Sequence, residues 1–214
     1  MTDETFDRDF WEQRWAQVRS DHPEALVGRP PNAHVLAELA DLPPGRALDA
    51  GCGHGAESMW LAARGWRVTG VDFSATALDI ARSTAASVGE EVAERIEWVE
   101  GDLGTWTPPE ATFDLVLSVY VHVDGSVPEM VRRLGGGVVP GGSLFLVGHL
   151  PVDPATGKPT PAAGQVQVSV DGALDGLGAS DWDIVLAEER RRAATGSGAD
   201  AVVLAVRRPH DRDQ

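Results

Sequence analysis

Short apolar runs alternate with amphipathic segments through most of the chain. The run FDLVLSVYV is almost continuously apolar, which is typical of a strand covered on both faces. Runs with the length and pattern of strands occupy 47–50, 67–72, 96–100, 113–119 and 143–148. Because helical patterns separate them, the sequence predicts an α/β fold with a doubly wound, mainly parallel sheet and helices on both faces.

The helical segments between these runs have recognisable ends and apolar faces. In the first segment, the residues spaced along one helical face are Ala56, Met59, Trp60 and Ala63. We expect Gly65 to end this helix and Ser74 to cap the next one. The residues that the second helix is expected to bury are Leu78, Ala81 and Ala85. A further short helix is expected to begin at Pro128 and to end before Gly135.

The N-terminal segment lies outside this alternation. It contains FWEQRWAQV, in which one helical face carries Trp11, Trp15 and Val18. We therefore expect one domain, 1–214, in which 1–40 forms a helical cap and 42–208 forms the core.

The C-terminal third contains an irregular loop followed by two further strands. Residues 151–168 are rich in proline and contain glycine, and they leave the edge of the sheet where ligands bind in open α/β folds. This loop is either a wall or lid of the site or a tolerated surface insertion. The runs 183–191 and 201–207 predict an antiparallel pair that completes the sheet.

Composition limits the classes of partner that the chain is expected to bind and the compartment in which it is expected to reside. Among 214 residues, 43% are hydrophobic, and the formal net charge is −15. A duplex-binding or membrane-binding surface is normally basic, so the charge argues against nucleic acid and anionic membranes as partners. A single cysteine excludes an intrachain disulfide and a multi-cysteine metal site, and we expect no metal. Neither a signal peptide nor a membrane span is recognisable, so the sequence predicts a soluble, cytoplasmic protein.

The stretch ALDAGCGHGAESMWLAARGWRVTGVDFS indicates a site for a nucleoside-containing cofactor. Gly51, Gly53 and Gly55 follow the first strand and open a helix, where positive φ and close approach of a ligand are needed. Asp72 ends the second strand and can accept hydrogen bonds from both ribose hydroxyls, at what we expect to be an exposed strand end. Asp49 would repel a pyrophosphate but would suit a ligand that carries an ammonium and a sulfonium. These features argue against a nicotinamide-dependent oxidoreductase.

Two later segments extend the site. VEGDL ends the third strand, so that Asp102 can accept from an adenine amino group and the Leu103 N–H can donate to the ring. VVPGGSLFLV predicts a tight turn that leads into the fifth strand.

This ordered series, from about Leu42 to Val147, resembles the class I S-adenosylmethionine-dependent methyltransferases. The resemblance implies a Rossmann-like sheet of seven strands with an antiparallel last strand, and S-adenosyl-L-methionine as cofactor. By analogy, the residues that line the methionine end are Asp49, Gly51 and Gly53, with Ser118 near its amino group. The residues at the ribose and adenine are Asp72, Phe73, Asp102 and Leu103.

The N-terminal FWEQRW is similar to a segment of the thiopurine and tellurite-type methyltransferases. The resemblance implies that Trp15 lies against the cofactor; the alternative is that Trp11 and Trp15 only pack a helix on the sheet. The thiopurine enzymes carry Asp-Arg after the fourth strand, whereas this chain has Ser118 and Val119, which argues against a thiopurine-like acceptor.

Two histidines are candidate catalytic residues. His122 and His149 follow the fourth and fifth strands, at the edge where an acceptor would enter, and histidine titrates near neutrality. Each could instead be an ordinary hydrogen-bonded loop residue. His54 is expected to support the glycine turn, and Cys52 to be a small buried residue within it. Tyr120 either lines the pocket or packs.

The sequence therefore predicts an enzyme that transfers a methyl group from S-adenosylmethionine to a heteroatom of a small molecule, with a thiol favoured. The alternatives are N- or O-methylation of a secondary metabolite and a non-catalytic protein that binds S-adenosylmethionine. The expected partner is a small-molecule methyl acceptor, and the sequence makes no prediction of oligomeric state.

Overall fold

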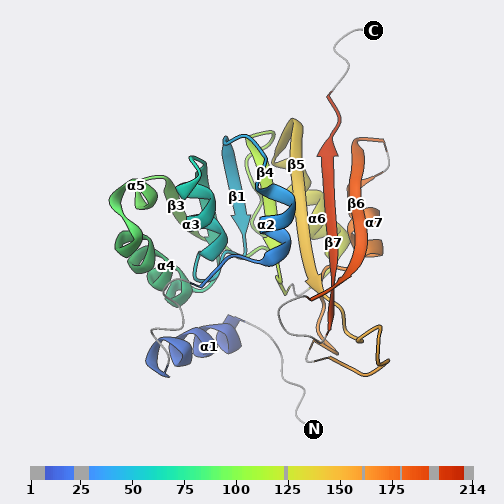
Figure 1. Ribbon diagram of the computed structural model, residues 1–214, viewed down its shortest axis with the longest axis horizontal. Coiled ribbons are helices and arrows are strands. Elements are labelled where there is room, and N and C mark those ends of the chain that lie inside the picture. Colours follow the sequence, from blue (N-terminus) through green and yellow to red (C-terminus); the bar gives the residue numbers. More distant parts are fainter. Residues whose placement is uncertain are drawn as a thin grey trace. The chain divides into compact units, whose positions relative to one another are not determined.

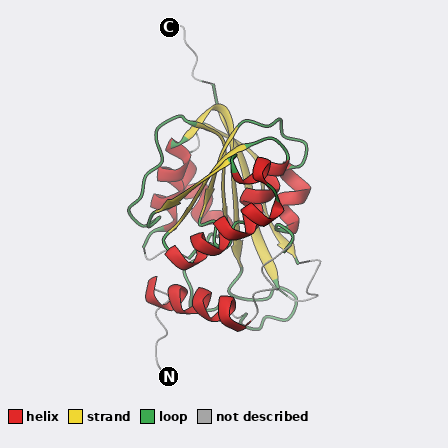
Figure 2. Ribbon diagram, turned by 90° about the vertical axis from the view of Figure 1, so that its left-hand side faces the viewer, coloured by secondary structure: helices red, strands yellow, loops and turns green. Residues whose placement is uncertain are grey.

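The computed structural model describes residues 8–21, 29–122, 125–160, 162–178, 180–192 and 198–209. A seven-stranded sheet has the strand order β3-β2-β1-β4-β5-β7-β6, and helices flank the strands (Figures 1 and 2). The strands are β1 Arg46–Ala50, β2 Arg67–Asp72, β3 Ile96–Glu100, β4 Phe113–Val119, β5 Val138–His149, β6 Trp182–Arg191 and β7 Ala199–Arg207. The helices are α1 Arg8–Asp21, α2 Ala33–Leu39, α3 Ala56–Ala63, α4 Ala75–Val88, α5 Glu90–Ala93, α6 Val127–Gly136 and α7 Val170–Leu177. This arrangement confirms the predicted fold class.

The chain divides into two compact units, Met1–Thr105 and Trp106–Gln214. In the first unit β1 pairs with β2 and β2 with β3, all in parallel. Four of the five β1 residues are buried, as the apolar run predicts. Because parallel strands end at the same edge, the segments that follow β1, β2 and β3 gather there.

Helix α4 follows the sequence prediction. Its N-terminus is capped by Ser74, whose hydroxyl accepts a hydrogen bond from the Ala77 amide at 3.0 Å. The predicted core positions Leu78, Ala81 and Ala85 are all buried.

The predicted apolar face of α3 is correct only for Ala56. The residues that α3 buries are Ala56, Ser58, Leu61 and Ala62. Met59 and Trp60 are only partly buried, and Ala63 is exposed. Ser58 turns inward because its hydroxyl donates to the Asp49 carboxylate at 2.6 Å, and this polar contact rotates the helix away from the face that apolar spacing selects.

Helix α1 confirms the predicted N-terminal face. Trp11, Trp15 and Val18 are half-buried, whereas the rest of α1 is largely exposed. Arg8 holds the start of α1 to the ends of β2 and β3, because its guanidinium donates to the Phe73 carbonyl at 2.7 Å and pairs with Glu100.

The second unit contains the antiparallel part of the sheet. Strand β5 is parallel to β4 and antiparallel to β7, which is also antiparallel to β6, as predicted (Figure 1). However, β5 begins at Val138 rather than at 143, and PGG forms an irregularity within the strand rather than a turn before it. Gly141 accommodates this irregularity with a φ of 84°.

Helix α7 was not predicted from the sequence. Its segment, VDGALDGL, contains two glycines, which lower helix propensity. The structure explains one of them: a Cβ at Gly176 would lie 2.7 Å from both the Pro128 carbonyl oxygen and the Val131 Cβ, so glycine allows α7 to pack closely on α6. Helix α6 itself begins one residue earlier and ends later than predicted.

The loop between β5 and α7 is irregular, as predicted, with one isolated bridge between Val152 and Pro159. It returns over the end of β5, where any side chain at Gly148 would overlap the Val168 carbonyl. Among the residues that the structure describes, no helix is long and apolar enough to span a membrane.

The packing of Trp98 gives the first prediction. A Cβ at Gly55 would lie 2.5 Å from the Trp98 ring, and Gly55 has a φ of +81°. Gly55→Ala should therefore destabilise the protein by more than the ~1–2 kcal/mol that the left-handed conformation alone costs. Thermal or urea denaturation, followed by circular dichroism, measures the loss.

Gly157→Ala is the matched control, because Gly157 has a similar φ of +64°, and a Cβ at this position would have no atom within 4 Å. Gly157→Ala should lose only the stability that the left-handed conformation costs. Equal losses in the two variants would contradict the close packing of Trp98.

Candidate active site

The glycine turn after β1 has the conformation that the sequence predicts. Gly51, Gly53 and Gly55 have φ values of 81°, 52° and 81°. The amides of Gly51 and Cys52 both donate to the Val71 carbonyl, at 2.8 and 3.0 Å. The turn is thus fixed to the end of β2 and exposes backbone at the edge where ligands bind in this class of sheet.

Trp15 lies directly against this turn. A Cβ at Gly53 would be 3.0 Å from the Trp15 ring, and the Trp15 and His54 rings are 5.6 Å apart. Trp15 therefore packs on the glycine turn, and its contact with a cofactor stays a prediction. His54 is nearly buried, and burial, followed by the charge of Arg29, lowers its pKa to about 4. A neutral His54 agrees with a supporting role in the turn.

Asp49 is a buried acid surrounded by other acids. Its side chain is 2% exposed and accepts a hydrogen bond from Ser58. Burial, then the charge of Glu57, and also that of Asp72, raise the pKa of Asp49 to about 8. A cationic ligand beside these carboxyl groups would stabilise their ionised forms, so this end of the site favours positive charge.

Asp72 is buried, and the expectation of an exposed strand end is wrong. Its two carboxylate oxygens accept from the amides of Gly53 and Ser74, both at 2.9 Å. The glycine turn and the start of α4 therefore cover the strand end. Burial raises the pKa of Asp72. Each carboxylate oxygen can accept a second hydrogen bond, so these contacts leave capacity for ribose hydroxyls.

The predicted adenine residues lie in the segment after β3. Asp102 is exposed and accepts from the Gly104 amide at 2.8 Å, whereas Leu103 is buried. Gly101 donates its amide to the Asp72 carbonyl at 3.0 Å, which joins this segment to the one that carries half-buried Phe73. The first unit thus brings the predicted ribose and adenine residues to one edge of its strands.

The Ser118 hydroxyl and the His54 Nε2 are buried polar atoms that have no hydrogen-bond partner among the described residues. Ser118 is in β4 and is 0% exposed. Leaving a buried hydroxyl unsatisfied costs free energy, so a ligand group that bonds it would be stabilising. The Ser118 hydroxyl can therefore bond to a polar ligand group at the end of β4, as the resemblance to the methyltransferases implies.

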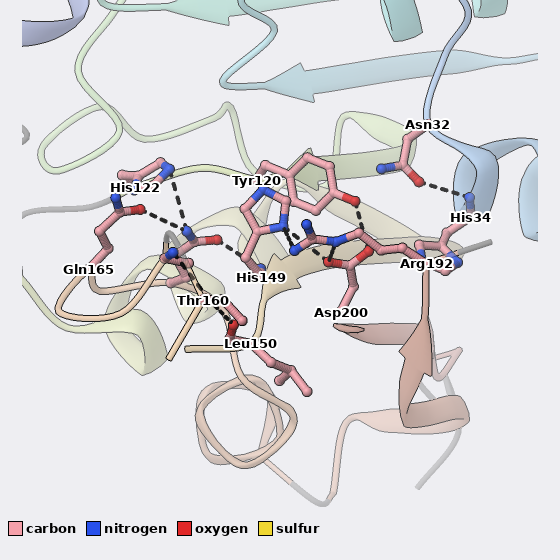
Figure 3. Close-up of polar contacts among 12 residues, drawn as sticks. Asn32, His34, Tyr120, His122, His149, Leu150, Thr160, Gln165, Arg192 and Asp200 are labelled. Carbon is pink, nitrogen blue, oxygen red and sulfur yellow. Dashed lines mark hydrogen bonds and ion pairs between the residues drawn. The ribbon is translucent and has the colours of Figure 1, made fainter. Parts of the chain in front are cut away.

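The second unit carries a polar cluster at the ends of β4 and β5 (Figure 3). The rings of Tyr120 and His149 are stacked, with centroids 3.6 Å apart and planes 24° from parallel. The Asp200 carboxylate accepts from the Tyr120 hydroxyl at 2.8 Å and from Arg192 Nε at 2.8 Å, and it lies 3.0 Å from His149 Nδ1. Tyr120 has a φ of 57°, a conformation that non-glycine residues rarely adopt and that is frequent at functional sites.

His122 lies near this cluster, and its pKa is low. Burial, followed by the charge of His149, lowers the pKa of His122 to about 4. Gln167, from the end of the irregular loop, has its amide nitrogen 3.5 Å from His122 Nε2 and accepts from the His149 amide at 2.8 Å. The loop therefore packs against both predicted histidines, which favours a wall over an unrelated insertion.

Sequence reasoning missed Asp200 and Arg192. Asp200 is completely buried, and it is directly opposite His149 in the antiparallel register of β5 and β7. An acidic residue at the start of the apolar run ADAVVLAV was the available signal, but the run was predicted to begin one residue later. Arg192 immediately follows β6, and no spacing in the sequence relates it to His149.

The remaining predictions for this region concern Cys52 and metals. Cys52 is buried, and burial, followed by the charge of Asp49, raises the pKa of its thiol well above the usual value, which agrees with a packing role. Within the described ranges no group of three or more His, Cys, Asp or Glu side chains could hold a metal ion.

The chain is similar to proteins of known type. A family of methyltransferase domains matches residues 47–142. The chain is 32% identical over 152 residues to probable thiol methyltransferase 2 of Arabidopsis thaliana, covering 70% of this chain and 65% of the relative. It is 34% identical over 137 residues to ribosomal RNA small subunit methyltransferase C of Alcanivorax borkumensis, covering 61% and 39%. It is also 34% identical over 126 residues to thiocyanate methyltransferase 1 of Arabidopsis thaliana, covering 59% and 53%.

The chain thus spans less than two thirds of the length of these relatives. Among solved structures, an S-adenosylmethionine-dependent methyltransferase from Mesorhizobium loti has the same fold, with a TM-score of 0.65 and 23% identity over 83% of this chain and 99% of that one. The predicted class I fold and the domain match agree. Residues 47–142 of this chain therefore match a family of methyltransferase domains, and the chain has the fold of a solved S-adenosylmethionine-dependent methyltransferase.

Proposed function

We propose that this protein transfers a methyl group from S-adenosylmethionine to the sulfur of a small thiol or a similarly soft acceptor. The observation that carries the proposal is Asp49, a buried acid beside the glycine turn of the matched domain, with a pKa raised to about 8. Such a site suits the cationic methionine end of the cofactor and disfavours a pyrophosphate.

The residues proposed to hold the cofactor are those that the resemblance implies. Asp49, Gly51, Gly53 and Ser118 would hold the methionine end, and Trp15 would cover it. Asp72 and Phe73 would hold the ribose, and Asp102 and Leu103 the adenine. In support, Asp72 organises the turn through Gly53, and the buried Ser118 hydroxyl has no partner among the described residues.

Bound S-adenosylmethionine supplies a methyl group that is already activated by a sulfonium. The protein therefore has to position the acceptor in line with that methyl group and to exclude water. His149 and His122 are the proposed catalytic residues, because both lie where an acceptor would enter an open α/β sheet. The low pKa of His122 keeps it neutral at physiological pH, so it can accept a proton or a hydrogen bond but cannot serve as a cationic acid.

A sulfur acceptor is supported by the relatives that act, by their names, on thiols and on thiocyanate. The net charge of −15 favours a small acceptor over the ribosomal RNA named in another relative. O- or N-methylation is the second candidate, because His149 faces the Asp200 carboxylate and a base matters most for a hydroxyl acceptor.

The proposal treats residues 1–214 as one methyltransferase domain, with a helical cap at 1–40 and a Rossmann-like core at 42–208. The position of Trp15 against Gly53 supports the likeness of FWEQRW to the thiopurine and tellurite-type enzymes. Residues 1–7 and 22–28 of the cap lie outside the described part of the chain.

An acceptor screen tests the proposed activity. With S-adenosylmethionine as donor, initial rates should give the highest kcat/KM for a thiol or inorganic sulfur nucleophile in a panel of thiols, phenols and amines. The reason is that a thiol with a pKa near ~8.5 already supplies some thiolate at neutral pH.

Calorimetry with S-adenosylmethionine, S-adenosylhomocysteine and NAD is the companion measurement, and only the first two should bind. A phenol or amine as best acceptor would replace the thiol proposal with the second candidate. Binding without transfer to any acceptor would indicate a non-catalytic binding protein.

Replacing Asp72 tests the ribose contact. Asp72→Ala should lower the affinity for S-adenosylmethionine roughly tenfold to a hundredfold, since hydrogen bonds to a charged group contribute ~1.5–3 kcal/mol each. It should also lower the thermal stability, because the amides of Gly53 and Ser74 lose their acceptor. Titration calorimetry and thermal denaturation separate the two effects.

Asp79→Ala is the matched control, because Asp79 is an exposed acid of α4 that pairs with Arg82 at 3.0 Å. Asp79→Ala should change neither the affinity for S-adenosylmethionine nor the thermal stability appreciably. Unchanged cofactor affinity in folded Asp72→Ala would show that the ribose is held elsewhere.

The raised pKa of Asp49 predicts how stability depends on pH. The folded chain binds this proton more tightly than the unfolded chain, whose carboxyl group has a pKa of 3.8. The contribution of Asp49 to stability is therefore complete below about pH 4 and is lost as pH rises to about 8. Asp49→Asn cannot ionise, so the free energy of unfolding of wild type minus that of the variant should fall across this range.

Urea denaturation of both proteins from about pH 5 to pH 9 measures this difference, in which titrations common to both proteins largely cancel. The affinity of wild type for the cationic cofactor should rise over the same range. A difference that does not change with pH would contradict the raised pKa.

A further inference from the structure

We infer that Asp200 is a positioning residue that fixes His149 in the tautomer able to take the acceptor's proton. This inference rests on the proposed function and adds to it residues that the sequence did not single out. It is carried by the geometry around one buried carboxylate, drawn in Figure 3.

The sheet register places these two residues together. His149 ends β5, and its direct partner in antiparallel β7 is Asp200. Directly opposite residues have their side chains on the same face of a sheet and close together. The contact of 3.0 Å between His149 Nδ1 and Asp200 Oδ1 therefore follows from backbone pairing and does not depend on a mobile loop.

Asp200 is held as an anion although it is completely buried. Burial alone would raise its pKa, but the hydrogen bonds from His149, Arg192 and Tyr120 lower the pKa of Asp200 to about 2. A buried carboxylate with three donors is an ordered acceptor, ionised throughout the physiological range.

The nitrogen Nδ1 of His149 has two competing neighbours. It lies 3.0 Å from Asp200 Oδ1 and 2.6 Å from Arg192 Nη2. A neutral imidazole has one N–H, so Nδ1 either donates to the carboxylate or accepts from the guanidinium. Donation leaves the lone pair on Nε2, which can then act as a base, whereas acceptance puts the proton on Nε2.

Burial decides this competition in favour of Asp200. The Arg192 side chain is 22% exposed and also donates through Nε to Asp200, so its Nη2, 2.6 Å from Nδ1, can turn toward water when Nδ1 carries the proton. The Asp200 side chain is 0% exposed, so water cannot replace a donor that it loses. The charge-assisted Nδ1–H bond to Asp200 is therefore the more costly one to lose.

Tyr120 fixes the plane of the His149 ring. Its ring is stacked on the imidazole, and its hydroxyl donates to the second oxygen of Asp200. The ring of His149 is thus held from one face and from its Nδ1 edge. This arrangement has the logic of a base oriented by a third group, in which the orienting carboxylate does not itself touch the reactant.

The proton balance of the step is simple. The acceptor atom gives its proton to His149 Nε2 as it bonds to the methyl carbon, while the carbon–sulfur bond of the sulfonium breaks and its electron pair stays on sulfur. His149 becomes an imidazolium that faces the Asp200 anion and later releases the proton to water. The other groups facing His149 are Arg192, Tyr120, His122 and Gln167.

The tautomer can be measured without any substrate. A two-bond ¹⁵N–¹H NMR correlation of the histidine rings, recorded at about pH 8 where unperturbed histidine is neutral, shows which ring nitrogen carries the proton. The His149 signal is assigned by its loss in His149→Gln. We expect Nδ1–H in the wild type and a shift to Nε2–H in Asp200→Asn, where an amide replaces the carboxylate.

The kinetic test compares two sulfur acceptors. 2-Mercaptoethanol must lose a proton on methylation, whereas thiocyanate has none to lose. In Asp200→Asn, kcat for 2-mercaptoethanol should fall by about tenfold to a thousandfold more than kcat for thiocyanate, as expected for loss of an oriented base. Asp183→Asn is the acid-to-amide control, because Asp183 is an exposed acid of β6 that pairs with Arg208. This variant should leave both rates unchanged.

Each outcome separates the positioning role from the proposed function. Nε2–H in the wild type, or equal losses with both acceptors, would overturn the positioning role, because a merely structural residue affects both acceptors alike. Nδ1–H in a wild type that methylates neither acceptor would support the positioning role and overturn the sulfur acceptor. Should Asp200→Asn not fold, the wild-type spectrum still decides the tautomer.

Discussion

The hydrogen bond from the Gly53 amide to the Asp72 carboxylate sets the shape of the first unit's binding edge. A carboxylate that is nearly buried must have its oxygens satisfied, and Asp72 achieves this with the amides of Gly53 and Ser74. One bond fixes the turn after β1, and the other fixes the start of α4. The positive φ of Gly53 presents its amide to Asp72, so the glycines serve the carboxylate as well as a ligand.

The strands and their mainly parallel arrangement could be predicted because continuous apolar runs and alternation with helices leave few arrangements. The face of α3 could not, because the hydrogen bond between Ser58 and Asp49 turns a polar residue into the core against the apolar spacing. Helix α7 was missed because Gly176 lowers helix propensity locally, while its value lies in close packing on α6, a tertiary effect. In both cases a contact between elements outweighed the local pattern.

The same distinction applies to the candidate site. Asp49, Asp72 and the glycines lie within one short stretch whose spacing carries the prediction. The cluster around Asp200 has no such local pattern, since His149 and Asp200 are 51 residues apart and meet only through strand register. Histidines at strand ends could be singled out by type, but the carboxylate that orients one of them required the structure.

Asp49 and Asp200 show how surroundings give one residue type two opposite roles. Both are buried, so desolvation raises the pKa of each. Asp200 has three donors, including a guanidinium, and is ionised with its countercharge already in place. Asp49 accepts from one hydroxyl and has acids as neighbours, so its ionised form needs a positive charge that the side chains named around it do not provide. The physical difference between the two proposed roles, orienting a base and attracting a cationic cofactor, therefore lies in whether the protein supplies the cation itself.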